Sequence, residues 1–86
     1  MDDILELLIS KLISFKGIEV LRTGYKLDVY YNIDSKHHIC VIFIKNNMII
    51  FYHYDDLLTM TFDELDIDRL IKLVLFCKDI AVERCL

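Results

Sequence analysis

The strongest chemical signal in this chain is a cluster of carboxylates around the start of its last helical segment. Six of the fourteen acidic residues lie between positions 55 and 68, and no basic residue follows until Arg69. Acids at a helix start cap exposed backbone amides and stabilise the helix dipole. An acidic surface can also steer a basic partner protein. The sequence leaves both interpretations open for Asp55, Asp56, Asp63, Glu64, Asp66 and Asp68.

Histidines and cysteines could in principle hold a metal ion, but their spacing does not support one. His38 and Cys40 share a face if their segment is extended, yet zinc takes four ligands. His37, Cys77 and Cys85 do not complete a recognisable pair of motifs. The acidic run also lacks the spacing and the glycine of a calcium-binding loop. We therefore expect turn histidines and buried cysteines, with no metal and no other cofactor.

Patterns of covalent or phosphate chemistry are also missing. None of the three serines lies in a Gly-x-Ser-x-Gly elbow. Gly17 and Gly24 are the only glycines, so no glycine-rich loop cradles a phosphate. His53 lies between two tyrosines in a strand pattern, where packing is the expected role. We therefore predict that the chain is not an enzyme.

The tyrosines are the remaining candidates for a binding role, and all five fall in segments with strand patterns. Aromatic residues in strands usually form cross-strand packing pairs. Exposed aromatic residues, in contrast, often anchor protein interfaces. Tyr30 and the face shared by Tyr52 and Tyr54 are the candidates for anchors.

Two helices and a run of strands are expected to position these residues. Apolar residues recur at helical spacing from Ile4 to Ile13, and a second helix is predicted from residue 61 or 66 to about residue 84. Strands are predicted at 18–23, 25–31, 38–45 and 48–54, with a tight hairpin turn at 46–47, because Asn tolerates positive φ. Residues 61–64 fit a capping box, with Met60 and Leu65 as its hydrophobic staple.

This order predicts one α+β domain over residues 1–86. We expect an antiparallel three- to four-stranded sheet, flanked in sequence by an N-terminal and a C-terminal helix (α-β-β-β-β-α), with both helices on one face. The third and fourth strands are apolar on both faces. Their second face therefore needs cover that the chain itself does not supply.

The composition supports the same expectation. Hydrophobic residues make up 56% of the chain, against about 45–50% in typical globular domains. A small domain buries a modest share of its surface, and large exposed apolar patches usually mark interfaces. Two-fold association is the commonest oligomeric state. We therefore predict a protein partner, with a homodimer as the simplest case.

Charge and cysteine content indicate the environment of the chain. Its net charge of −4 and scattered basic residues disfavour direct binding to nucleic acid. Three cysteines without a Cys-x-x-Cys spacing suggest a reducing compartment. The first residues are acidic rather than basic as in a signal peptide, and no apolar run is long enough to span a membrane. The expected location is the cytoplasm.

The helix–three strands–helix order resembles the double-stranded RNA-binding domain. That family grips phosphates with lysines at the start of its last helix. This chain carries Asp63, Glu64, Asp66 and Asp68 there. The resemblance therefore implies a topology, and the charges argue against the RNA partner.

A second resemblance is to the restriction-type nuclease core, in which an acid on one strand precedes an acid-x-Lys motif on the next. Asp28 and the segment Asp34-Ser35-Lys36 are the matching residues. The resemblance implies a small metal-dependent nuclease. Because Asp34 and Lys36 are expected in a turn, they would not present to a shared metal.

The leading hypothesis is a small acidic protein-binding module, an inhibitor or adaptor that occupies a partner's surface, acting as a homodimer. In general character, although in no particular residue, it resembles phage and viral anti-defence proteins of the anti-CRISPR type. The partner is expected to be a protein with a basic surface. The alternatives are the small metal-dependent nuclease-like enzyme and a structural subunit of a larger assembly.

Overall fold

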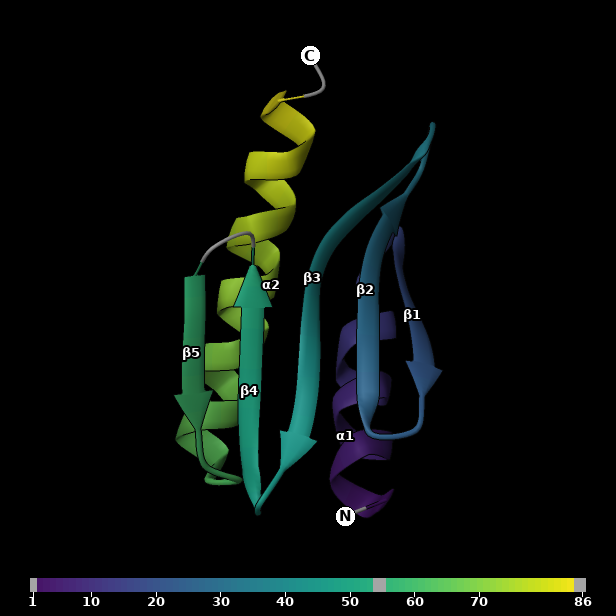
Figure 1. Cartoon of the computed structure of the whole chain (residues 1–86). Helices are drawn as coiled ribbons and strands as arrows, with labels where there is room; N and C mark the ends of the chain where they lie inside the picture. The colour runs from purple at the N-terminus through teal and green to yellow at the C-terminus, as the bar shows by residue number, and fades with distance from the viewer. Residues whose placement is uncertain (1, 54–55, 85–86) are drawn as a thin grey trace.

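Two helices and a five-stranded antiparallel sheet make up the computed structural model, which describes residues 2–53 and 56–84. The strands are neighbours in the order in which they follow in the chain, and both helices lie behind the sheet (Figure 1). The elements are α1 (Asp2–Ile13), β1 (Ile18–Thr23), β2 (Lys26–Asn32), β3 (Lys36–Lys45), β4 (Met48–His53), β5 (Asp56–Met60) and α2 (Glu64–Arg84).

The expected α+β order and the placement of both helices on one face are confirmed, but the strand count was too low. The sheet has five strands because residues 56–60 pair antiparallel with β4 as an edge strand. Four of these five residues are exposed, so β5 lacks the alternation of buried and exposed residues that identifies a half-buried strand.

The core lies between the sheet and the helices. Leu5, Leu8 and Leu12 of α1 are fully buried at helical spacing, as are Leu70 and Val74 of α2. The sheet contributes buried residues to the same core, most of them alternate residues along a strand. These strand residues are Ile18, Leu27, Val29, Ile39, Cys40, Ile42, Ile44, Ile49, Phe51 and Met60. We call this side of the sheet the inner face and the other side the outer face.

Residues with positive φ lie where the chain turns. Asn46 and Asn47 have φ values of 53° and 60°, which confirms the predicted two-residue hairpin turn between β3 and β4. Gly17 lies four residues beyond the end of α1 and leads into β1. Its φ is 86°, and a Cβ there would lie 2.7 Å from Cε1 of Tyr31, so both conformation and space require glycine.

A bulge between β2 and β3 corrects one expectation about side-chain direction. Val29 pairs with Cys40, whereas the next residue, Tyr30, pairs with His38, so Ile39 is the additional residue in β3. Cys40 is therefore buried in the core while His38 stays exposed and lies beside Asp28 of the outer face. The prediction that these two residues share one face was wrong.

Neither helix within the described ranges is long and apolar enough to cross a lipid bilayer.

Candidate interaction surface

The acidic cluster is divided by the fold. Asp56 begins β5 and pairs with His53, whereas the other described acids lie at the start of α2, beyond the far end of β5 (Figure 1). Four residue steps along a strand place Asp56 about 14 Å from Met60, which precedes this turn. Asp55 and Tyr54 lie outside the described residues. The structure thus brings together Asp63, Glu64, Asp66 and Asp68 but not the whole predicted set.

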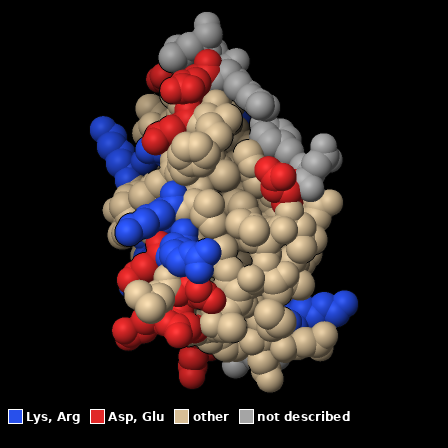
Figure 2. Space-filling view, turned by 90° about the vertical axis from the view of Figure 1, so that its left-hand side faces the viewer, with Lys and Arg blue, Asp and Glu red and all other residues tan. Residues whose placement is uncertain are grey.

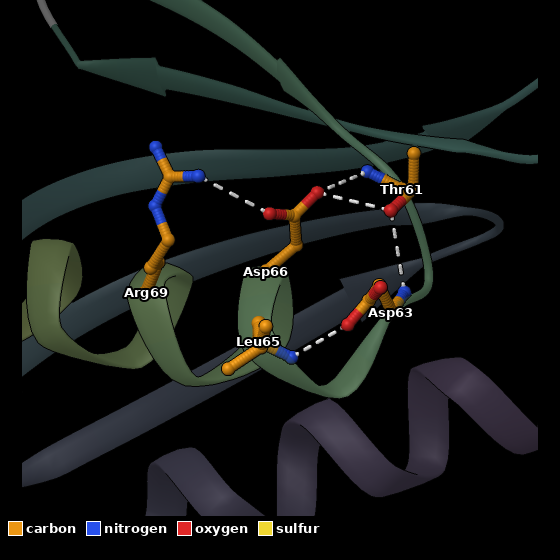
Figure 3. Close-up of polar contacts among 5 residues, drawn as sticks. All are labelled: Thr61, Asp63, Leu65, Asp66 and Arg69. Carbon is orange, nitrogen blue, oxygen red and sulfur yellow. Dashed lines mark hydrogen bonds and ion pairs between the residues drawn. The ribbon is translucent and has the colours of Figure 1, made fainter.

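Two of these acids hold the beginning of α2 in place (Figure 3). The Leu65 backbone N–H donates to Oδ1 of Asp63 at 2.8 Å, so Asp63 is the N-cap of the helix. Both the backbone N–H and the hydroxyl of Thr61 donate to Oδ2 of Asp66 at 3.0 Å. Arg69 approaches Oδ1 of the same carboxylate at 3.3 Å. These contacts support the capping interpretation for Asp63 and Asp66.

The capping geometry differs from the predicted capping box. The helix begins at Glu64, and the cap is Asp63 rather than Thr61. The expected staple between Met60 and Leu65 was also wrong, because Met60 is buried and Leu65 is 72% exposed. Phe62 instead packs against the core. An Asp and a Thr two positions apart are both good caps, so the local sequence did not select between them.

The hydrogen bonds at this turn perturb one titration. The N–H and then the hydroxyl of Thr61 stabilise the ionised carboxylate, and these bonds lower the pKa of Asp66. Arg69 adds to this effect, and desolvation opposes it. Asp66 therefore keeps its charge, and with it these hydrogen bonds, to a lower pH than an unperturbed aspartate would.

The tyrosines fall on different surfaces. Tyr30 and Tyr52 lie on the outer face, where Tyr52 is 42% exposed and Tyr30 is half-buried. Tyr31 packs against the core. Tyr25 lies in the turn between β1 and β2, so its assignment to a strand was wrong.

The outer face carries an apolar surface with no described element packed on it (Figure 1). Phe43 is 36% exposed, Tyr52 42% and Leu57 55%. Phe43 is the cross-strand partner of Ile50, and Tyr52 is the cross-strand partner of both Val41 and Leu57. We call this surface the outer patch, formed by Val41, Phe43, Met48, Ile50, Tyr52 and Leu57.

Polar residues border the outer patch over β2. Nε2 of His38 lies 3.1 Å from Oδ1 of Asp28, and Nζ of Lys26 lies 3.6 Å from Oδ2 of the same carboxylate. The His38 ring meets the ring of Tyr30 edge-on at 5.1 Å, and Nζ of Lys36 lies 4.5 Å from the centre of that tyrosine ring. These five residues form a polar corner.

The polar corner contains one element of an acid–base site, the pair of Asp28 and His38, because a carboxylate that orients an imidazole is a common arrangement for proton transfer. However, it lies on a sheet face, and none of its residues lines the grooves along the helices that are described below. Asp28 and Lys36 lie on this face, whereas Asp34 lies in the turn before β3. Among the described residues, no group of three or more His, Cys, Asp or Glu side chains could hold a metal ion.

The cysteines expected in the core are there. Cys40 and Cys77 are buried, and Cys85 lies outside the described residues. Burial raises the pKa of the Cys40 thiol, and the neighbouring Cys77 and Asp28 raise it further. Burial also raises the pKa of Cys77. These thiols are protonated at neutral pH and do not have the reactivity of a nucleophile.

The helix layer contains an apolar groove that the sequence did not predict. A groove of about 470 Å³ runs between α1 and α2, with Phe15, Ile71 and Leu75 in its wall and Lys11 and Lys72 at its border. Helical periodicity predicted the buried stripes but could not show how closely the two helices would approach. Asp68 lines this groove, and Glu64 and Asp68 line a smaller one of about 310 Å³ beside it.

Comparisons of the chain with protein-family models, with curated proteins and with solved structures found no match.

Proposed function

We propose that the protein is a binding module that attaches to another protein surface through the outer patch. The single observation that carries this proposal is that β3 and β4 present apolar side chains on both faces, while the helices cover only one face. Val41, Phe43, Ile50 and Tyr52 lie in the middle of the sheet, where a partner would remove them most completely from water.

The arrangement of the outer face supports this role. Interfaces combine an apolar centre rich in aromatic residues with a polar border, and aromatic residues are frequent hot spots. Here Phe43 and Tyr52 lie in the centre, and the polar corner borders them on one side. Burial of such side chains contributes roughly 25 cal/mol for each Å² of apolar surface. Inhibitors and adaptors that occupy a partner's surface work in this way.

The proposal is tested by site-specific photocrosslinking in the cell that makes the protein. A benzoylphenylalanine is placed at Tyr52 in one variant and at Phe76 in a matched control. Phe76 lies on α2 and is 62% exposed, against 42% for Tyr52, so random encounters would label position 76 at least as strongly.

The expected result is a discrete protein adduct, with another protein or with a second copy, at position 52 only. Thermal melting of both variants checks that each is folded. Equal labelling at the two positions, or adducts from position 76 alone, would contradict the proposal.

A further inference from the structure

We infer that the occupant of the outer patch is a second copy of this chain, stacked sheet against sheet about a two-fold axis that runs across the strands. The inference deepens the proposed function and rests on it. It follows from how the strand register arranges the outer-face residues into rows.

Two neighbouring rows cross all five strands without interruption. One residue from each strand contributes to each row, and successive members are direct cross-strand partners. The first row is Leu21, Asp28, Val41, Tyr52 and Leu57, and the second is Thr23, Lys26, Phe43, Ile50 and Thr59.

A two-fold axis between the sheets, running along the line between these rows, places each row over the other row of the partner copy. Val41 then meets Phe43 of the second copy, and Tyr52 meets Ile50 of the second copy. Aligned sheets pack about 10 Å apart with their strands about 30° from parallel, so the residues of β3 and β4 meet most closely. Apolar side chains therefore meet apolar side chains at the centre.

The charges of the two rows complement each other under the same operation. Lys26 and Asp28 are the only charged residues in the rows, and the axis places Lys26 of each copy over Asp28 of the other. Within one copy the two are already an ion pair at 3.6 Å, and Asp28 has only 15% of its side chain exposed. The stacked pair would form an alternating group of two lysines and two aspartates.

The neutrality of these rows matters because the chain as a whole carries a net charge of −4. Two identical acidic molecules repel each other, so a self-association surface must not add like charges to that repulsion. Seen from the β5 edge, charged side chains gather on the left, toward α2, whereas the right-hand part, toward the outer face, is mostly uncharged (Figure 2). The outer face therefore suits a second copy better than the helix layer does.

The size of the face sets the expected strength. Five strands at about 4.8 Å spacing and about 20 Å in length give about 500 Å² for each copy. A pair then covers about 1,000 Å², the lower limit of specific interfaces. We therefore expect a dimer that dissociates in the micromolar range, and one that salt strengthens by screening the net negative charges.

The first experiment is sedimentation velocity on the full chain from about 1 to 300 µM, a range that spans the expected dissociation. The wild-type chain and Phe76→Glu are expected to shift from monomer to dimer over this range, with dissociation constants within two-fold of each other. Phe43→Glu is expected to raise the dissociation constant by at least tenfold, because the new charge would be buried against Val41 of the partner copy.

The second experiment tests the axis by charge exchange. Lys26→Glu alone and Asp28→Lys alone each place like charges over each other and should be monomeric. A mixture of the two variants restores opposite charges at both contacts and should form heterodimers. Circular dichroism and thermal melting show whether each variant is folded. If Asp28→Lys does not fold, Asp28→Asn replaces it and should relieve the defect of Lys26→Glu in the mixture.

A wild-type chain that remains monomeric throughout would overturn the inference, as would equal effects of Phe43→Glu and Phe76→Glu. A dimer without rescue in the mixture would overturn the proposed axis. If the chain is monomeric but position 52 still crosslinks to a different protein, the second copy is excluded and the proposed function stands. If it is monomeric and position 52 crosslinks to nothing, both are wrong.

Discussion

Asp63→Ala should destabilise the fold although Asp63 is an exposed acid. The substitution removes the 2.8 Å hydrogen bond from the Leu65 N–H and leaves that amide without its cap. Loss of such a cap costs about 1 kcal/mol, in a range of about 0.5–2 kcal/mol. For a domain of this size, about 1 kcal/mol lowers the melting temperature by about 4–8 °C.

Urea denaturation followed by circular dichroism measures this change, with two matched variants beside it. Asp63→Asn keeps a good N-cap and should lose only a few tenths of a kcal/mol. Asp68→Ala removes an exposed acid five residues later whose side chain makes no hydrogen bond within the described part of the chain, and its effect should stay within about 0.5 kcal/mol. If Asp63→Ala destabilises the fold no more than Asp68→Ala, the capping role of Asp63 is refuted. The acidic residues would then be better interpreted as a surface that binds a basic partner.

Four further predictions concern the core and the turns. Gly17→Ala should destabilise the fold more than Gly24→Ala. Both glycines have positive φ, which costs a non-glycine residue about 1–2 kcal/mol, but only at Gly17 would the new Cβ clash with Tyr31, at 2.7 Å. Chemical denaturation of the two variants compares their free energies of unfolding. Native Cys40 should react with iodoacetamide at pH 8 at least tenfold more slowly than in urea. Because burial raises the pKa of Cys40, the free energy of unfolding should fall as pH rises above about 8.5, where the unfolded thiol ionises. The slope for this group is at most about 1.4 kcal/mol per pH unit. Cys40→Ala should flatten this slope, and an unchanged slope would contradict a raised pKa for Cys40. The lowered pKa of Asp66 contributes stability that is present above about pH 4 and is lost as pH falls further. Asp66→Asn should therefore flatten the acid limb of a curve of unfolding free energy against pH. An identical acid limb in this variant would count against the Thr61 contacts.

The parts of the fold that depend on local patterns followed from the sequence. The spacing of Leu5, Leu8 and Leu12 gave the buried stripe of α1, and paired asparagines gave the hairpin at 46–47. The apolar pattern of β3 and β4 also indicated a sheet with a second apolar face. These features depend on residues close together in the chain, so one sequence suffices to predict them.

The features that escaped prediction depend on partners far apart in the chain. The bulge at Ile39 arises from how β3 pairs with β2, and it moved Cys40 into the core and left His38 exposed beside Asp28. The edge strand β5 is stabilised by pairing with β4 and has little apolar alternation of its own. For the candidate site, the sequence pointed to Tyr30 and Tyr52 but could not show the rows that the register creates across five strands.

The most direct measurement of the outer patch as a contact surface is a concentration series of ¹⁵N- and methyl-resolved NMR spectra. Between about 10 µM and 1 mM, across the expected dissociation range, resonances of Val41, Phe43 and Ile50 should shift together. Those of Leu65 and Phe76 on α2 should stay constant. Shifts confined to the helix layer, or spectra that do not change over this range, would contradict self-association through the sheet.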